Sequence, residues 1–224
     1  MKINLIILLF ISFYSAAGII VSGTRFIYSE NDDELSLSID NLSSETLYLV
    51  QSWIEDDKNV KTTQFILTPP LFKSYPNSKN KVRIIRLSQQ LPQDKEILFW
   101  LHVKSLPAYE DIGQNNLHII VKSSFKLIYR PSHLNEIAIN AAEKILFSLK
   151  GNQLTAYNPT AVYITFRDLY INQQEIMTPG MLSPFSQKNW TIENQPKVIL
   201  SWSALNDYGG KTPEQTQTII NDIT

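Results

Sequence analysis

Cysteine is absent from the 224 residues, which excludes disulfides, thiolate metal sites and cysteine nucleophiles. Glycine is scarce: the chain has seven, and none lies between residues 24 and 112. Neither GxGxxG nor GxxxxGKS/T occurs, so the phosphate-binding loops that these motifs form are missing. An excess of positive charge is also lacking, since 20 Lys and Arg oppose 21 Asp and Glu. Because nucleic-acid-binding domains carry a basic excess, we expect no nucleic-acid partner. We also expect no cofactor.

Catalytic signatures are missing as well. The chain has neither a GxSxG elbow nor an HExxH motif. Its three histidines, His102, His118 and His133, show no metal-ligand spacing, and the first two lie in strand-like patterns where a structural role is far more common than catalysis. The sequence therefore predicts a protein that is not an enzyme and holds no metal.

One long hydrophobic run is present, at the N-terminus. Lys2 precedes the run at 5–14, LIILLFISFY, and small residues follow at 15–17. This order is typical of a secretory signal peptide, so we expect residues 1–17 to be cleaved from an exported chain. An uncleaved membrane anchor is the alternative, but polar residues dilute the run and no basic cluster follows it. No other run is long enough to span a bilayer, so we expect no stable membrane insertion.

The remaining chain alternates apolar and polar residues in many short segments, the period typical of strands. Leu35, Leu37 and Ile39, for example, alternate with serines and an aspartate. The other predicted strands are 46–55, 81–87, 97–104, 115–129, 143–149, 153–157, 160–170 and 197–203. A helix over 134–147 is an alternative by propensity, which we disfavour in an all-β chain.

Strands at this spacing, separated by turn formers, predict antiparallel sandwiches. The chain without its signal peptide is too long for one seven-stranded sandwich and suits two of about 100 residues each. Pro131 cannot continue a strand ladder, so the corner Tyr129-Arg130-Pro131 is the natural boundary. We therefore expect an all-β protein with domains at 18–135 and 136–224.

The segment 115–129 is about three times the length of a typical strand. Its alternate residues Leu117, Ile119 and Val121 project to one face. One interpretation, favoured by the pattern alone, is a core strand buried on both faces. The other is a strand that pairs with a second chain by β-augmentation.

The order of several motifs resembles the PapD-like periplasmic chaperones of the chaperone–usher pilus pathway. The combination of LPQDKEILF, KLIYRP and NDYGG at this spacing is specific, whereas TPP alone is weak. The matching segments are Thr24-Arg25, 48–55, 68–70, 91–99, 126–131, 158–160 and 206–210. They span nearly the whole chain after the signal peptide.

The resemblance implies two immunoglobulin-like domains in an L or boomerang arrangement. It implies a periplasmic chaperone, independent of ATP, that binds pilus or fimbrial subunits and delivers them to an outer-membrane usher. Each subunit lacks its last strand, and the chaperone complements it with a donor strand, here Leu117, Ile119 and Val121. Whether the free chain caps this strand as a homodimer is left open. The short loop at about 105–116 resembles the short-loop subgroup.

Further residue roles follow from the resemblance. Arg25 and Lys126 match two cations that hold the C-terminal carboxylate of the subunit. Lys126 has opposite parity to the donor residues, which a flat strand does not explain. Other matched positions are an interdomain salt-bridge network at Glu96, Arg130 and Asp207, a cis-proline at Pro69 after Thr68, and usher contacts at Leu49, Gln51 and Pro70. For the usher contacts, ordinary strand surface and a turn are the alternative.

The chain departs from the family at two points and has one competing interpretation. It lacks the cysteine pair that some members carry near the C-terminus, and its tail after Gly210 diverges. The alternative function is an exported immunoglobulin-like structural or adhesive surface protein. The C-terminal sequence of this chain, Asn221-Asp222-Ile223-Thr224, does not fit a pilus subunit, which has a penultimate aromatic residue.

Overall fold

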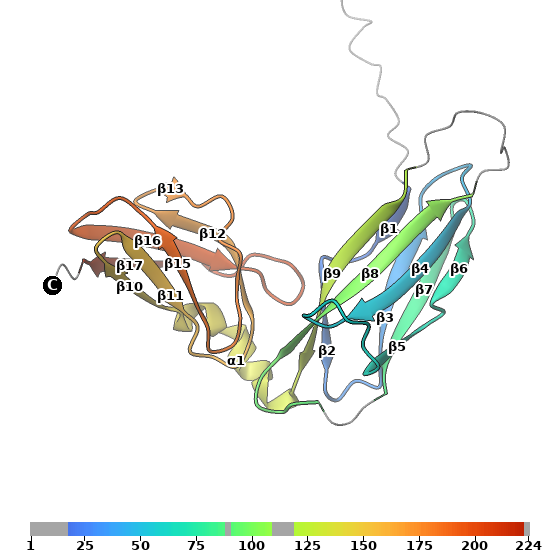
Figure 1. The fold of residues 1–224 in the computed structure, drawn as a ribbon, viewed down its shortest axis with the longest axis horizontal. Helices are drawn as coiled ribbons and strands as arrows, with labels where there is room; N and C mark the ends of the chain where they lie inside the picture. Colours follow the sequence, from blue (N-terminus) through green and yellow to red (C-terminus); the bar gives the residue numbers. More distant parts are fainter. Residues whose placement is uncertain (1–17, 88–90, 109–118, 222–224) are drawn as a thin grey trace, which may run out of the picture.

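A computed structural model describes residues 18–87, 91–108 and 119–221. It consists of two β-sandwiches that meet at an angle (Figure 1). The prediction of two β-sandwich domains is thereby confirmed. The expected signal peptide, and Leu117 and His118 of the predicted donor segment, lie outside the described residues. Within these residues, the structure contains no helix with the length and hydrophobicity needed to span a membrane.

The first sandwich has one sheet of four strands and one of five. The four-stranded sheet has the order β1 (Ile19–Val21), β3 (Glu34–Asn41), β7 (Lys79–Arg86) and β5 (Phe65–Thr68). The five-stranded sheet has the order β2 (Arg25–Ser29), β9 (Val121–Arg130), β8 (Ile97–Pro107), β4 (Tyr48–Glu55) and β6 (Leu71–Ser74). Between them lies a core that includes the fully buried Tyr28, Ile39, Leu101 and Leu127.

The second sandwich pairs a three-stranded sheet with a larger one. The smaller sheet is β10 (Leu146–Lys150), β11 (Gln153–Tyr157) and β15 (Gln187–Thr191). The larger is β13 (Gln174–Glu175), β12 (Ile164–Ile171), β16 (Lys197–Ala204) and β17 (Gln215–Ile220), with β14 (Met181–Leu182) beside β12. Its core includes Leu154, Leu169 and Trp202, whose indole N–H donates to the Ala142 carbonyl at 2.9 Å.

The segment at 134–147 corrects the sequence prediction, because most of it is helical. Helix α1 (Asn135–Ile139) lies between short 3-10 helices at Ser132–Leu134 and Ala141–Lys144, and β10 begins only at Leu146. Leu134, Ala141 and Ala142 are buried against the second core, a spacing that suits a helical face better than a strand. This segment connects the two domains, so no sheet neighbour holds it extended (Figure 1).

Two local features bear on the matched positions. The peptide bond between Thr68 and Pro69 is cis, as the resemblance implied. β2 and β9 form the one parallel pair among the described strands, whereas the other pairs are antiparallel.

Candidate functional site

Two cations lie side by side at the start of the parallel pair. The register aligns Arg25 of β2 with Lys126 of β9, so both side chains project from the same face of the sheet. The guanidinium of Arg25 donates to the carbonyl oxygen of Leu205 in the second domain at 3.4 Å. None of the ion pairs among the described residues involves either cation.

The pKa values of these two cations reflect their partial burial. Burial lowers the pKa of Lys126, and the neighbouring Arg25 charge lowers it further. Burial also lowers the pKa of Arg25, although Asp207 and Glu96 oppose that effect. Binding an anion would favour the charged form of both groups, and a carboxylate fits a guanidinium fork beside an ammonium.

The edge of β9 is open immediately before Lys126. β2 pairs with β9 only from Lys126 to Arg130, while β8 covers the opposite edge from Val121 to Tyr129. The backbone from Val121 to Phe125 therefore has no strand on the β2 side. Ile119 and Val121 are 66% and 52% exposed. A strand buried on both faces, the alternative favoured by pattern alone, does not describe this segment.

The opposite parity noted in the sequence is real in the structure. Lys126 shares its face with Lys122 and Ser124, whereas Val121 shares the other with Phe125. The ring of Phe125 packs edge-on against Phe26 at 5.9 Å, which places that second face over the core. The two cations and the exposed apolar residues thus occupy opposite faces of one strand.

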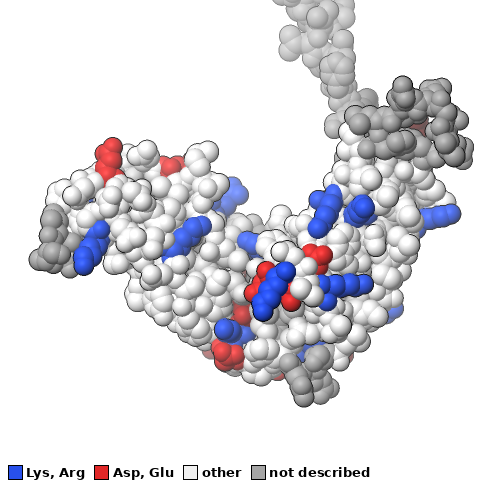
Figure 2. All heavy atoms as spheres, viewed as in Figure 1, with Lys and Arg blue, Asp and Glu red and all other residues white. Residues whose placement is uncertain are grey.

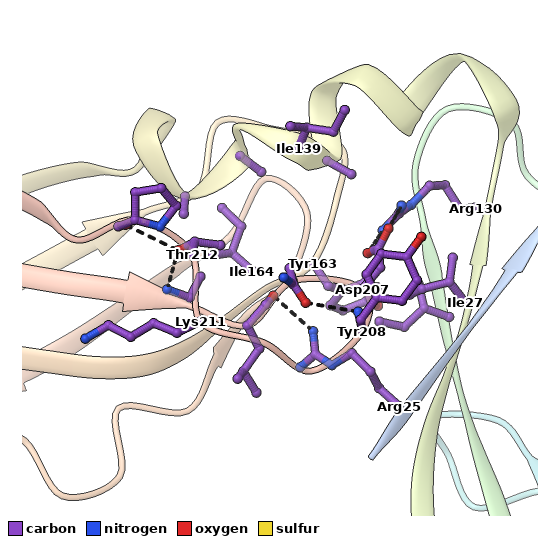
Figure 3. A pocket seen from close by; sticks show the side chains of 18 residues that line it. Arg25, Ile27, Arg130, Ile139, Tyr163, Ile164, Asp207, Tyr208, Lys211 and Thr212 are labelled. Carbon is purple, nitrogen blue, oxygen red and sulfur yellow. Dashed lines mark hydrogen bonds and ion pairs between the residues drawn. The ribbon is translucent and has the colours of Figure 1, made fainter. Parts of the chain in front are cut away.

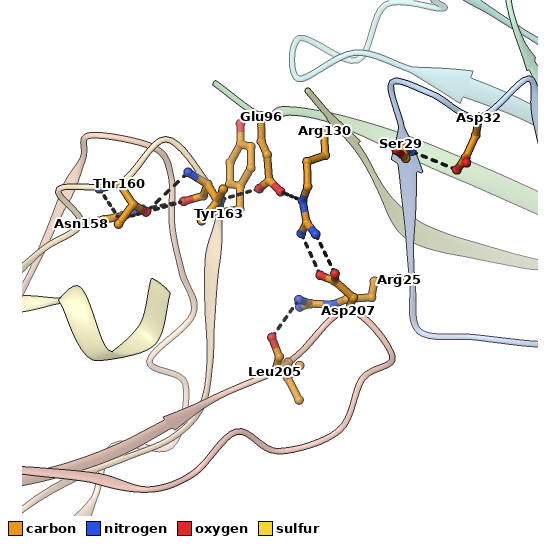
Figure 4. Close-up of polar contacts among 11 residues, drawn as sticks. Arg25, Ser29, Asp32, Glu96, Arg130, Asn158, Thr160, Tyr163, Leu205 and Asp207 are labelled. Carbon is orange, nitrogen blue, oxygen red and sulfur yellow. Dashed lines mark hydrogen bonds and ion pairs between the residues drawn. The ribbon is translucent and has the colours of Figure 1, made fainter. Parts of the chain in front are cut away.

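An ion network connects the domains close to Arg25 (Figure 4). Arg130 donates through Nε to Glu96 at 2.5 Å and through both terminal nitrogens to Asp207 at 2.6 and 2.7 Å. Glu96 also accepts from the backbone N–H of Tyr163 at 2.6 Å. The three sequence-matched residues therefore meet, and the network fixes the hairpin between β16 and β17 against the first domain.

A hollow separates the two domains in the space-filling view, with positively charged side chains on its flanks (Figure 2). Beside Arg25 it contains a pocket of about 290 Å³ (Figure 3). Its walls come from β2, β9, the helical connection and the β16–β17 hairpin. Sequence reasoning missed the pocket, because its lining is spread over segments far apart in the chain.

The three residues matched to usher contact form one exposed patch. Leu49 and Gln51 point outward from β4, and Pro70 precedes β6, whose Leu71 lies opposite Gln51. Leu71 is 53% exposed and extends the patch. The strand alternation of β4 could have predicted the outward face, but only the pairing of β4 with β6 adds Leu71.

Both halves of the chain match family models. A model described as "Pili and flagellar-assembly chaperone, PapD N-terminal domain" matches residues 18–135, and "Pili assembly chaperone PapD, C-terminal domain" matches 140–216.

Individual relatives cover most of the chain. It is 36% identical over 208 residues to the probable fimbrial chaperone LpfB of Escherichia coli O157:H7, covering 91% of this chain and 90% of the relative. It is 34% identical over 203 residues to the chaperone protein FimC of Escherichia coli strain K12, covering 89% and 84%. A chain in the solved complex of the Salmonella enterica SafA pilin with the SafB chaperone is similar at 25% identity and a TM-score of 0.79, covering 89% of this chain and 95% of that one.

Proposed function

The chain belongs to the PapD family of pilus-assembly chaperones, and from this premise we propose how it acts. It is a periplasmic chaperone that binds and stabilises pilus or fimbrial subunits by donor-strand complementation and delivers them to an outer-membrane usher. The observation that supports the proposal is the open edge of β9, which ends at two cations that form no ion pair among the described residues.

The edge geometry fixes the direction of the bound strand. Unpaired backbone groups along Val121 to Phe125 can accept an added strand, but β2 blocks the edge from Lys126 onward. A partner strand that ends there with a carboxylate on Arg25 and Lys126 must run parallel to β9. The partner is therefore a polypeptide that binds through the strand carrying its C-terminus.

The apolar residues of the segment supply the hydrophobic part of binding. Ile119 and Val121, together with Leu117 from the sequence, fill the groove that the missing strand leaves in the subunit. Full burial of such a side chain contributes roughly 1.5–3 kcal/mol. Because these side chains project from the face opposite the cations, the carboxylate and the groove do not compete for the same space.

The two cations set the register. A charge-assisted hydrogen bond contributes about 1.5–3 kcal/mol, and Arg25 presents a planar fork whereas Lys126 presents a compact charge. Fixing the carboxylate fixes which partner residue faces each donor residue, because a shift by one position would exchange the faces.

The other matched residues orient the molecule. Glu96, Arg130 and Asp207 hold the angle between the domains so that the cleft keeps its shape. Leu49, Gln51 and Pro70, extended by Leu71, form the surface that contacts the usher. No step of this function requires bond chemistry by the chain.

Location and boundaries complete the proposal. Residues 1–17 act as a cleaved signal peptide that directs the chain to the periplasm. The first domain, 18–135, carries the donor strand, and the second domain, 136–224, closes the cleft.

The replacement Arg25→Ala tests the anchor. It removes one cation from an otherwise unchanged edge, so we expect export and folding to persist while co-purification of coexpressed subunits falls at least about tenfold. Arg167→Ala is the matched control, because the Arg167 side chain is 61% exposed and reaches Asp168 only at 3.8 Å.

Subunit recovery at the wild-type level with Arg25→Ala would refute the anchor role. The competing function, an exported structural or adhesive surface protein, predicts that the chain appears in sheared surface fibres. The proposed chaperone stays in the periplasmic fraction.

A further inference from the structure

Two large, solvent-exposed side chains line the pocket beside Arg25 (Figure 3). Tyr208, in the β16–β17 hairpin, is 98% exposed, and Ile139, at the end of α1, is 73% exposed. The hairpin that carries Tyr208 is held in place, since Asp207 binds Arg130 through two hydrogen bonds. Tyr208 and Ile139 both line the pocket, so a ligand that entered it would cover exposed apolar surface.

The floor of the pocket continues the strand pair that carries the two cations. Ile27 and Ile128 face each other in the register two positions beyond Arg25 and Lys126. They project from the same face, about 7 Å further along the strands. Both residues line the pocket. A bound polypeptide whose C-terminus lies at the two cations therefore ends beside this largely apolar pocket.

The charged groups in the walls already have partners, apart from Arg25. Arg130 pairs with Asp207, and Lys211 contacts Asp168 at 3.0 Å. A charged side chain that entered would find no free counter-charge once a carboxylate occupied Arg25. Apolar walls with satisfied charges favour an uncharged side chain with a large apolar body.

We propose that this pocket receives the side chain of the last residue of the bound polypeptide and selects for a large apolar one. The inference rests on the proposed function, because the terminal carboxylate on Arg25 and Lys126 places that residue at the pocket. The pocket would then add discrimination among partners that share the same terminal carboxylate.

Peptide binding to the full chain tests the proposal. The probes are synthetic strand-forming peptides of alternating valine and threonine that end in free leucine, free glycine or leucine amide. We expect the leucine acid to bind at least about tenfold more tightly than the glycine acid, as burial of a leucine side chain predicts. In Tyr208→Ala and Ile139→Ala most of that preference should disappear.

Matched controls lie away from the cleft. Tyr75→Ala and Ile220→Ala remove similar side chains, 62% and 78% exposed, and should leave the preference for leucine unchanged. Equal binding of the leucine and glycine acids, or an equal loss of preference in the control variants, overturns the proposed role of the pocket. In either case, tighter binding of the leucine acid than of the leucine amide would still support the carboxylate anchor. Equal binding of leucine acid and leucine amide would instead contradict the anchor on which both proposals depend.

Discussion

His102 is a buried histidine on the outer face of the five-stranded sheet. Its Nε2 lies 2.9 Å from a carboxylate oxygen of Glu55, and its Nδ1 lies 2.8 Å from the hydroxyl of Ser124. The ring is hydrogen-bonded through Nδ1 to the Ser124 hydroxyl, whereas Nε2 lies near Glu55 without making a hydrogen bond. Burial lowers the pKa of His102 and Lys122 lowers it further, while Glu55 opposes the shift. His102 thus connects β8 to its two neighbours in the sheet, since Glu55 lies in β4 and Ser124 in β9.

The lowered pKa predicts a dependence of stability on pH. Below the ordinary value of 6.5, the unfolded chain binds a proton at this histidine before the folded chain does. The contribution of His102 to the free energy of unfolding should therefore be greatest above pH 6.5. It should fall as the pH drops toward the pKa of the folded state, by at most about 1.4 kcal/mol per pH unit. Urea titrations from pH 7 to pH 5 measure the slope.

The variant His102→Gln isolates this contribution, because glutamine keeps a polar amide that can hydrogen-bond Ser124 but does not titrate. Its stability should depend less on pH than that of the wild type. His133→Gln, which replaces an exposed histidine, serves as the control. Parallel pH profiles for wild type and His102→Gln would contradict the account.

At the scale of residues, sequence motifs predicted ion pairs between side chains better than hydrogen bonds to backbone groups. Glu96, Arg130 and Asp207 are polar residues in specific motifs, and the structure brings them into one network. The contacts of Glu96 with the Tyr163 amide and of Arg25 with the Leu205 carbonyl have no signal in side-chain identity. Backbone groups of any residue can make them, so only the fold reveals them.

At the scale of elements, β9 combines a paired half with an open half. Residues from Lys126 onward pair with β2 on one edge, whereas Val121 to Phe125 pair with β8 alone. An open edge with exposed apolar side chains is a risk for aggregation in an isolated protein. It is useful only if another strand covers it, from a subunit or from a second copy of the chain.

The substitution Val121→Asp tests the strand itself. Val121 is exposed in the free protein, so we expect the free energy of unfolding to change by no more than about 0.5 kcal/mol. In the complex it would bury an unpaired carboxylate in an apolar groove, so recovery of coexpressed subunits should fall at least about tenfold. Thermal melts and co-purification measure the two effects.

Ile120→Asp is the matched control, since Ile120 is 50% exposed and belongs to the opposite parity of the same segment. It should retain much more subunit than Val121→Asp. If the two variants lose binding equally, the alternation of faces does not govern recognition.

The sequence predicted most strands but misread the connection between the domains. Period-two alternation marks strands such as β3, where Leu37 and Ile39 are buried and the intervening serine is not. Over 134–147 local propensity favours a helix, whereas the all-β class disfavours one, and the structure is helical over most of this segment. Helix propensity acts locally, whereas the all-β class describes the chain as a whole. Local propensity therefore determines the conformation of this connection.

At the scale of the whole molecule, the proposed function requires the two domains to be held at a fixed angle. The two cations belong to the first domain, yet Arg25 is capped by Leu205 of the second, and the pocket beside it needs walls from both. Sequence motifs spread over nearly the entire chain identified the family. They could not reveal the pocket, because its walls form only when the domains meet.

The central claim is that a partner strand pairs with the open edge of β9. Hydrogen exchange of the backbone amides from Ile119 to Phe125, measured in the free protein and in its complex with a subunit, tests it most directly. We predict rapid exchange in the free protein for the amides that face away from β8, and strong protection in the complex that stops where β2 begins. Unchanged exchange along this segment in a complex that is protected elsewhere would contradict the claim.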